Sequence, residues 1–400
     1  MERIIYRELK STPQIWGFLA LLGVFIAAAG AVVLYIEHHG HIVTGMDNQI
    51  VWGLPHVFAI FLIVAASGAL NVASIGSVFG KVAYKPMARL SALLAVALLV
   101  GGLAVLVLDL GRPDRLIVAM TNFNFISIFT WNILLYTGFV AIVAVYMFTQ
   151  MARGVPTYAV KTAGLAAFLW RLILTTGTGS IFGWLVARQA YDAAIMAPLF
   201  IVLSFAIGMA SFLLVTMGIT HLTGRAFGAE LRTRLARLLA IFIAALMFFT
   251  TMQHLTNLYA AEHWGVESFI LRDGGIYTTL FWGVQVLVGG VLPMGILFHP
   301  TLGKEAGLVV LSSLLVIAGG FAQIYVLVIG GQAYPLEIFP GYEVSSSFAD
   351  GVINSYTPSM LELILGLGGV ALALAITIIG MKFLRILPNS LSDANVGSKV

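Results

Sequence analysis

The chain has no cysteine among its 400 residues. This absence excludes disulfide bridges, thiolate zinc sites and iron–sulfur clusters held by cysteines of this chain. Charged residues are also scarce, at 10% of the chain, whereas hydrophobic residues make up 60% and the mean hydropathy is +1.00. A soluble domain of this length does not have that composition, but a polytopic helical membrane protein does.

Two other patterns are missing. The sequence has no succession of alternating segments of about ten residues, which excludes an outer-membrane β-barrel. The first apolar run is not followed by a small-residue cleavage site, so we expect it to remain in the membrane as a signal-anchor helix. Lipid head groups suffice to explain the net charge of +4, and we expect membrane lipids rather than nucleic acid as partners.

Ten apolar runs are long enough to cross a bilayer, so we predict an all-α polytopic membrane protein with ten transmembrane helices. The runs lie near residues 14–36, 54–80, 89–110, 124–149, 158–177, 196–221, 235–261, 275–298, 306–331 and 359–384. Polar residues at 175–180 interrupt the fifth run. Residues 181–197, which follow it, could form a re-entrant or interfacial segment.

The distribution of positive charge predicts the orientation. If the N-terminus is cytoplasmic, only four of the 21 Lys and Arg residues lie on the outer side: Arg112, Arg115, Arg188 and Arg272. Arg171 lies within a helix, which leaves sixteen on the cytoplasmic side. Because positively charged loops stay in the cytoplasm, we expect both termini there, with the chain in the inner (cytoplasmic) membrane of a prokaryote.

A weak internal repeat divides the ten helices. The sequence P-H-V-F at 55–58 opens the second run, and P-L-F-I at 198–201 opens the sixth. Both halves then run in the same direction through the membrane. We expect one membrane domain over residues 1–400, with four-helix bundles at 54–178 and 196–331 and flanking helices at 14–36 and 359–384.

Polar side chains gather at the outer ends of the second, third and fourth runs. His56 begins the second run, and Asp109 follows the third at an elbow broken by Pro113. Ionisable groups at this depth usually mark a substrate site or a proton path. The full set is His56, Asp109, Arg112, Trp131 and Asn132, together with Arg171 near the middle of the fifth run.

These residue types suit a quinone head group. Its two carbonyls need hydrogen-bond donors, its ring needs aromatic or apolar walls, and its oxidation needs a proton acceptor. We predict that His56 and Asp109 are catalytic and that they bind the quinone together with Arg112, Trp131, Asn132 and Arg171. The structural alternative is that His56 and the elbow cap helix ends, while Arg171 locks the bundle.

Other histidines leave alternatives open. His254 lies in the seventh run at a depth similar to that of His56, and one histidine on each of two helices could ligate a b-type haem. We expect His38, His39 and His41 to be solvated loop residues, since no fourth metal ligand is evident. No acidic residue falls in the inner half of a predicted span, so a relay of carboxylates across the membrane is not expected.

The elbow carries a family resemblance. The sequence V-L-D-L-G-R-P-D-R-L at 107–116, followed by W-N at 131–132, resembles the NrfD/polysulfide-reductase-C family of integral membrane subunits. The likeness covers roughly residues 50–331. W-G-L-P-H-V-F at 52–58 and the two flanking helices are similar to the ten-helix branch of that family. G-G-Q-A-Y-P-L-E-I-F-P-G at 330–341 most resembles its DsrP type.

This resemblance implies a subunit without its own haem or iron–sulfur cluster. Such a subunit exchanges electrons between menaquinone or ubiquinone and a ferredoxin-like iron–sulfur subunit on the extracytoplasmic face. Family quinone sites lie in the outer half of the first bundle, which matches His56, Asp109, Arg112 and Asn132.

The DsrP likeness implies further partners of the DsrMKJO type, including cytochrome subunits, and a role in sulfur-compound metabolism during anaerobic respiration. We expect the acidic outer loops, including residues 337–342, to bind the extrinsic partner. The alternative from a different class is a secondary transporter built on a parallel helical repeat.

Labelling of introduced cysteines tests the orientation. Because positive charge keeps both termini inside, Asp114→Cys should react with an impermeant thiol reagent only from the outside, and Ser398→Cys only from the inside. The absence of native cysteine removes background labelling. Reaction of both variants from the same side would contradict the predicted number of helices.

Overall fold

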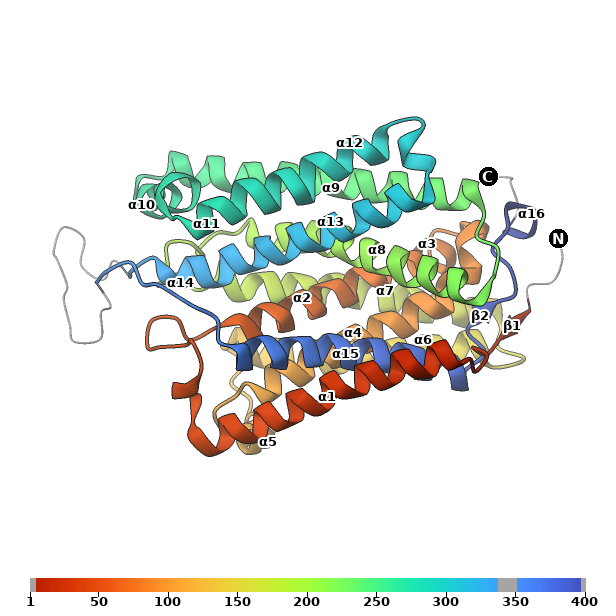
Figure 1. Cartoon of the computed structure of the whole chain (residues 1–400), viewed down its shortest axis with the longest axis horizontal. Coiled ribbons are helices and arrows are strands. Elements are labelled where there is room, and N and C mark those ends of the chain that lie inside the picture. Colours follow the sequence, from red (N-terminus) through yellow and green to blue (C-terminus); the bar gives the residue numbers. More distant parts are fainter. Residues whose placement is uncertain (1–4, 337–350, 397–400) are drawn as a thin grey trace.

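Helices that cross the whole molecule dominate the computed structural model, which describes residues 5–336 and 351–396 (Figure 1). Within those residues, ten spans are long and apolar enough to cross a membrane, which confirms the predicted fold class. The spans are α1 (Pro13–His39), α2 and α3 (Leu54–Ala69, Asn71–Ser77), η2 and α4 (Val82–Met87, Ala88–Leu108), α6 (Ile128–Met151), α7 (Thr157–Gly183), α8 (Met196–Thr223), α9 (Ala229–Tyr259), α11, η6 and α12 (Ile276–Thr279, Leu280–Val291, Leu292–Phe298), α13, η8 and α14 (Ala306–Tyr325, Val326–Gly330, Gly331–Ala333) and α15 (Met360–Phe383).

Both ends of the chain lie at the same end of the bundle, on the right in Figure 1. There β1 (Tyr6–Arg7) pairs antiparallel with β2 (Leu387–Pro388). We call this the terminal end and the opposite one the distal end. Short elements complete the described chain: η1 (His41–Val43), η3 (Pro113–Arg115), α5 (Leu116–Thr121), η4 (Ala261–His263), α10 (Trp264–Ser268), η5 (Phe269–Asp273), η7 (Leu302–Lys304) and α16 (Asp393–Val396).

Two of the spans that extend beyond their apolar runs do so through polar residues. The hydroxyls of Thr175 and Thr178 donate hydrogen bonds to the carbonyls of Arg171 and Leu174, one turn earlier, so α7 continues through the polar stretch to Gly183. Residues 184–195 form turns rather than a re-entrant helix. Helix α9 begins at Ala229, which places Glu230 in its first turn. The predicted docking segment 337–342 lies outside the described residues.

Helix α2 is the central helix, buried along almost its whole length. It packs against α4, α7, α8, α13 and α15. Its α-helical hydrogen bonding is interrupted at Leu70, where the Ser91 hydroxyl from α4 donates to the Ala69 carbonyl (2.6 Å) and accepts from the Ala73 amide (3.1 Å). A side chain inserted between a carbonyl and the amide four residues later is a recognised cause of helix breaks.

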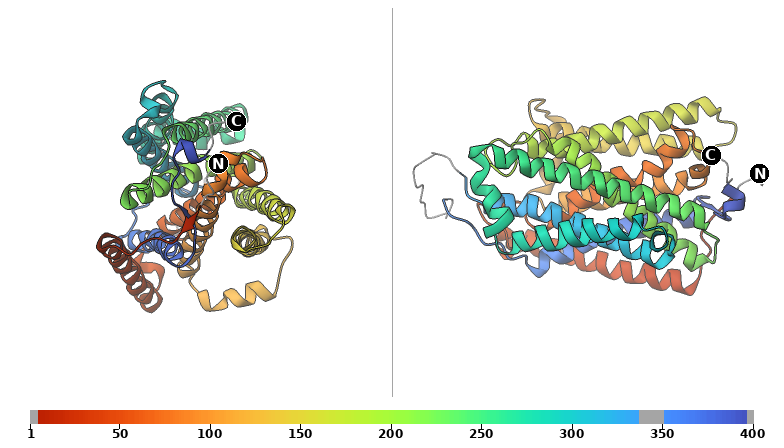
Figure 2. Two further views of the ribbon diagram at one scale, coloured as in Figure 1. Left: turned by 90° about the vertical axis from the view of Figure 1, so that its right-hand side faces the viewer. Right: turned by 90° about the horizontal axis from the view of Figure 1, so that it is seen from above.

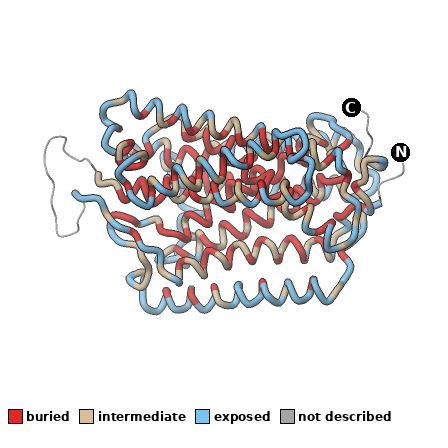
Figure 3. The backbone as a smooth tube through the Cα atoms, turned by 45° about the horizontal axis from the view of Figure 1, so that its top comes forward, coloured by how far each residue is buried: buried red, intermediate tan, exposed pale blue. Residues whose placement is uncertain are grey.

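The remaining helices surround α2 in two groups. Helices α4, α6 and α7 lie on one side of it, while α8, α9, α12 and α13 pack together on the other. Helices α1 and α15 pack against each other, and α15 also contacts α2 and α4. In the end-on view the green and teal helices form one group, away from α1 and α15 (Figure 2). Buried residues concentrate between these groups, and exposed ones lie at the periphery (Figure 3).

A close helix crossing joins α2 to the second group. Gly68 of α2 and Gly208 of α8 face each other, and a Cβ on Gly208 would overlap the backbone of Gly68. A Cβ on Gly68 would overlap the carbonyl of Ser204. Small residues allow helix backbones in membranes to approach this closely. The crossing therefore depends on glycine at both positions.

The variant Gly208→Ala should lower the free energy of unfolding by about 1–3 kcal/mol, because the added methyl group overpacks the crossing. Thermal unfolding in detergent measures this change. The matched control is Gly218→Ala in the same helix, where no neighbouring heavy atom lies within 4 Å of the new Cβ. That variant should be neutral or slightly stabilising, since alanine favours helix. Equal unfolding temperatures for the two variants would contradict the close crossing.

Candidate functional site

A histidine and an aspartate from two helices meet at the distal end of the molecule. His56 is the third residue of α2, and Asp109 is the C-cap of α4. The His56 Nδ1 atom lies 2.8 Å from the Asp109 Oδ2 atom. The Asp109 side chain is fully buried, whereas 14% of the His56 side chain is exposed. The structure thus brings together the two residues that were predicted to be catalytic.

Asp109 occupies a position that disfavours a carboxylate. The C-terminal end of a helix carries a partial negative charge, so it stabilises cations rather than anions. Burial adds the cost of removing the carboxylate from water. Two histidines compensate: His56, and His41 of η1, whose Nε2 lies 2.9 Å from the Asp109 carbonyl oxygen and 4.0 Å from Oδ1. A carboxylate held at such a cost favours a chemical role over a simple helix cap.

The position of His41 corrects the expectation of a solvated loop residue. Gly40 ends α1 with φ at 79°, a left-handed conformation that glycine adopts readily, and turns the chain toward α4. The His41 side chain then packs beside Asp109 and is 30% exposed. Its neighbour His39 stays exposed and contacts the Tyr35 carbonyl and ring within its own helix. A tertiary contact, which local sequence does not reveal, distinguishes the two residues.

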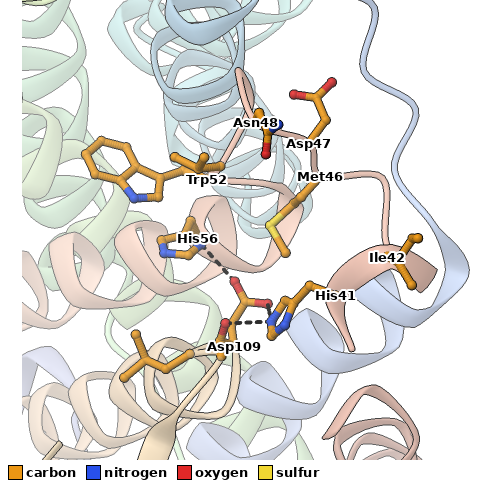
Figure 4. Close-up of a pocket in the computed structure, with 11 residues that line it drawn as sticks. His41, Ile42, Met46, Asp47, Asn48, Trp52, His56 and Asp109 are labelled. Carbon is orange, nitrogen blue, oxygen red and sulfur yellow. Dashed lines mark hydrogen bonds and ion pairs between the residues drawn. The ribbon is translucent and has the colours of Figure 1, made fainter. Parts of the chain in front are cut away.

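The histidine–aspartate pair opens onto a cavity of about 500 Å³, within the range of small-molecule sites. Figure 4 shows the imidazoles of His56 and His41 on either side of the Asp109 carboxylate. The cavity is lined by His41, Ile42, Met46, Asp47, Asn48, Val51, Trp52, His56, Asp109, Leu110 and Gly111. Its walls therefore combine apolar and aromatic side chains with a few polar groups.

The first turn of α2 is anchored by a buried carboxylate of α15. The Leu54 amide donates to the Tyr356 hydroxyl (2.7 Å), which donates to Glu362 (2.5 Å). Burial and the hydrogen bond to Glu362 raise the pKa of Tyr356, so its hydroxyl keeps its proton. The second Glu362 oxygen accepts from the amides of Gly45 and Ser359. This network fixes the start of the helix that carries His56.

The pair has the arrangement of a general base with an orienting acid. Asp109 Oδ2 lies 2.8 Å from Nδ1 of His56, without the alignment of a hydrogen bond, and Nε2 is the ring nitrogen that does not contact Asp109. A buried carboxylate stabilises a proton on the nitrogen that faces it, which leaves Nε2 as the acceptor in the neutral ring. The imidazolium that forms after proton uptake is then stabilised by Asp109. The geometry is suited to accept one proton from a hydroxyl group bound in the cavity.

Two of the other predicted site residues are exposed: Arg112 at the elbow and Trp131 in the first turn of α6. Arg112 forms a two-pronged ion pair with Asp114, at 2.9 and 3.0 Å, and this hydrogen bonding raises the pKa of Arg112 and lowers that of Asp114. Trp131 is 45% exposed, and its indole nitrogen donates to the Phe125 carbonyl. Neither Arg112 nor Trp131 is among the residues that line the cavity.

The last two predicted residues are buried between helices. Asn132 donates to the carbonyl of Ile128 in its own helix and to that of Gly177 in α7. The Arg171 guanidinium lies over the rings of Phe168 and Phe205, at 4.9 and 5.1 Å, with no carboxylate partner among the described residues. Both contact helices rather than the cavity.

A second histidine–carboxylate pair lies in the other group of helices. The His254 Nδ1 atom is 2.7 Å from Glu267, and Asn257 donates to the other oxygen of that carboxylate at 2.8 Å. Glu267 is buried, at 1% exposure. The ring of Phe281 covers His254 edge-on. Both oxygens of Glu267 thus take part in hydrogen bonds, whereas neither oxygen of Asp109 accepts one from a described residue.

Comparison with known proteins identifies the relatives of this fold. The chain matches the family described as "Polysulphide reductase, NrfD" over residues 42–335. It is 30% identical over 376 residues to the "Hdr-like menaquinol oxidoreductase integral membrane subunit" of Archaeoglobus fulgidus, covering 92% of this chain and 93% of the relative. It is 25% identical to a putative membrane subunit of the dimethyl sulfoxide reductase of Halobacterium salinarum, covering 92% and 91%.

A third relative is a selenate reductase subunit of Mesobacillus selenatarsenatis, 25% identical with 84% of this chain and 87% of the relative covered. The family match spans most of the chain, including His56, Asp109 and the elbow between the third and fourth spans. With ten spanning helices among its described residues, the chain belongs to the NrfD/polysulfide reductase family of integral membrane proteins.

Proposed function

We propose that this protein is the quinone-interacting membrane subunit of a respiratory redox complex. The observation that carries the proposal is the imidazole of His56, which contacts buried Asp109 through Nδ1 and lines a cavity of about 500 Å³. The relatives support it, since they are named as subunits of a menaquinol oxidoreductase, a dimethyl sulfoxide reductase and a selenate reductase. Menaquinone or ubiquinone would be the bound substrate.

The proposed reaction interconverts a quinol and a quinone. Oxidation of one quinol releases two protons and two electrons, and reduction takes up the same. His56 Nε2 accepts the first hydroxyl proton from the quinol, Asp109 stabilises the resulting imidazolium, and Nε2 accepts the second proton once the first has left. The proton then leaves past His41, whose ring contacts Asp109 and is partly open to water. Trp52 lines the same cavity and supplies an aromatic wall for the quinone ring.

The electrons require a partner, because a chain without cysteine does not hold a thiolate-bound cluster. We assign this role to a ferredoxin-like iron–sulfur subunit at the distal end, beside the cavity. Further subunits of the DsrMKJO type, including cytochromes, would complete a complex that acts on sulfur compounds. The positive-inside distribution supports a prokaryotic inner membrane with both termini in the cytoplasm, which makes the distal end extracytoplasmic.

The variant His56→Gln tests the proton acceptor. Glutamine keeps a donor for Asp109 but does not take up a proton at neutral pH. In the intact complex, quinol-dependent turnover should fall by about 10²-fold or more, the usual contribution of a general base. Reduction of the iron–sulfur partner by an artificial donor should persist, because electron transfer beyond the quinone does not use His56.

The control is His254→Gln, which alters the equally buried histidine–carboxylate pair of the second group of helices. Its turnover should stay close to that of the wild type. Normal turnover of an assembled His56→Gln complex would place the quinone elsewhere. A loss only in the His254 variant would move the site to the second group of helices.

A further inference from the structure

A buried glutamine ties the end of α13 and α14 to one wall of the cavity. Gln332 is 1% exposed, and its side chain uses all four of its hydrogen-bonding positions. Its Oε1 accepts from the amides of Val51 and Trp52, both at 3.0 Å. Its Nε2 donates to the carbonyls of Trp52 (3.0 Å) and Val328 (2.8 Å). One side chain therefore holds the Trp52 backbone at its amide and at its carbonyl.

The residue held in this way faces the proposed base. The Trp52 ring is stacked on the His56 ring, with the centroids 6.1 Å apart, and on the Tyr191 ring, with the centroids 6.5 Å apart. Phe182 meets it edge-on at 5.9 Å. Gln332 fixes the backbone from which the Trp52 side chain extends, and the rings of Tyr191 and Phe182 pack beside the indole and limit its rotamers. The indole is thereby held as a wall of the cavity.

The glutamine is itself braced from behind. Its backbone carbonyl accepts hydrogen bonds from Arg188 (3.0 Å) and from the side chain of Gln49 (3.2 Å), and Arg188 also donates to the Gln49 carbonyl. Arg188 is half-buried, and this burial lowers the pKa of its guanidinium. A buried polar network costs free energy unless every member is paired. Here the Gln332 side chain is fully paired, whereas Oε1 of Gln49 is buried without a hydrogen bond from a described residue.

The helical turns before Gln332 also contribute to holding the cavity wall. Residues Val326–Gly330 form a π-helix, a rare conformation that often occurs at functional sites. The Val328 carbonyl accepts from the Tyr191 hydroxyl at 2.8 Å, and Gly331 leaves room for the Tyr191 ring. The end of this span thus binds two aromatic residues. It binds the Trp52 backbone through the Gln332 side chain, and it binds the Tyr191 hydroxyl through the Val328 carbonyl.

We propose that Gln332 is a positioning residue for the quinone site: it acts through Trp52, which it fixes as the aromatic wall opposite the bound ring. This inference rests on the proposed function, since it takes the cavity as the quinone site. Gln332 does not line the cavity. Its effect is therefore on binding of the substrate, not on the transfer of the proton.

The test is Gln332→Met in the intact complex, a change that keeps the length of the side chain and removes all four hydrogen bonds. The KM for quinol should rise about tenfold while kcat changes little. The contact between Trp52 and the quinone ring stabilises the bound substrate and the transition state equally, so its loss weakens binding without slowing the reaction step. The matched control is Gln323→Met, which removes a buried amide of the same span that bonds Thr250. Its KM should match that of the wild type.

An unchanged KM in an assembled Gln332→Met complex would overturn the proposal, and so would equal losses of kcat in both variants. If that complex does not assemble, Arg188→Lys removes part of the bracing and should raise KM in the same direction by a smaller factor; an unchanged KM there is equally decisive. The His56→Gln variant separates the two proposals. Loss of turnover in His56→Gln with a normal KM in Gln332→Met refutes only the positioning role.

Discussion

The site depends on one buried carboxylate. Asp109 lies out of water at the end of a membrane helix whose dipole opposes its charge, so it needs compensation. His56 supplies it at 2.8 Å and His41 from the other side. These contacts require a fixed start of α2. Tyr356, which precedes the last spanning helix, and Glu362, which lies in it, hold that start through hydrogen bonds. Segments far apart in the chain thus converge to place a single imidazole.

The same pairing occurs twice with different consequences. Both oxygens of Glu267 have partners, in His254 and Asn257, so that pair is complete without a ligand. Neither carboxylate oxygen of Asp109 accepts a hydrogen bond from a described residue, although Oδ2 lies 2.8 Å from His56, which lines a cavity. A buried polar group that lacks a partner retains free energy to be gained from a ligand or a water molecule. This contrast supports placing the chemistry at Asp109 and a structural role at Glu267.

The apolar runs predict the ten spans, because the backbone hydrogen bonds of a membrane helix all form within the same segment of the chain. The runs do not predict that α7 continues through the polar stretch that contains Thr175 and Thr178. Hydropathy counts these hydroxyls as polar, whereas in the structure they bond to carbonyls of their own helix. The pairing of His56 with Asp109 could be anticipated from their shared depth. The contacts of Gln332 with Trp52 could not, because they join residues far apart in the chain that carry no local pattern.

The central claim is that quinone binds in the cavity beside His56. Photolabelling of the intact complex in membranes with an azido-quinone tests it most directly, since labelled peptides identify the site without relying on turnover. The account predicts adducts within residues 41–56, which contribute most of the cavity lining, and their loss when excess unlabelled quinol competes. Labelling confined to the helices around His254, or labelling at 41–56 that quinol does not displace, would contradict it.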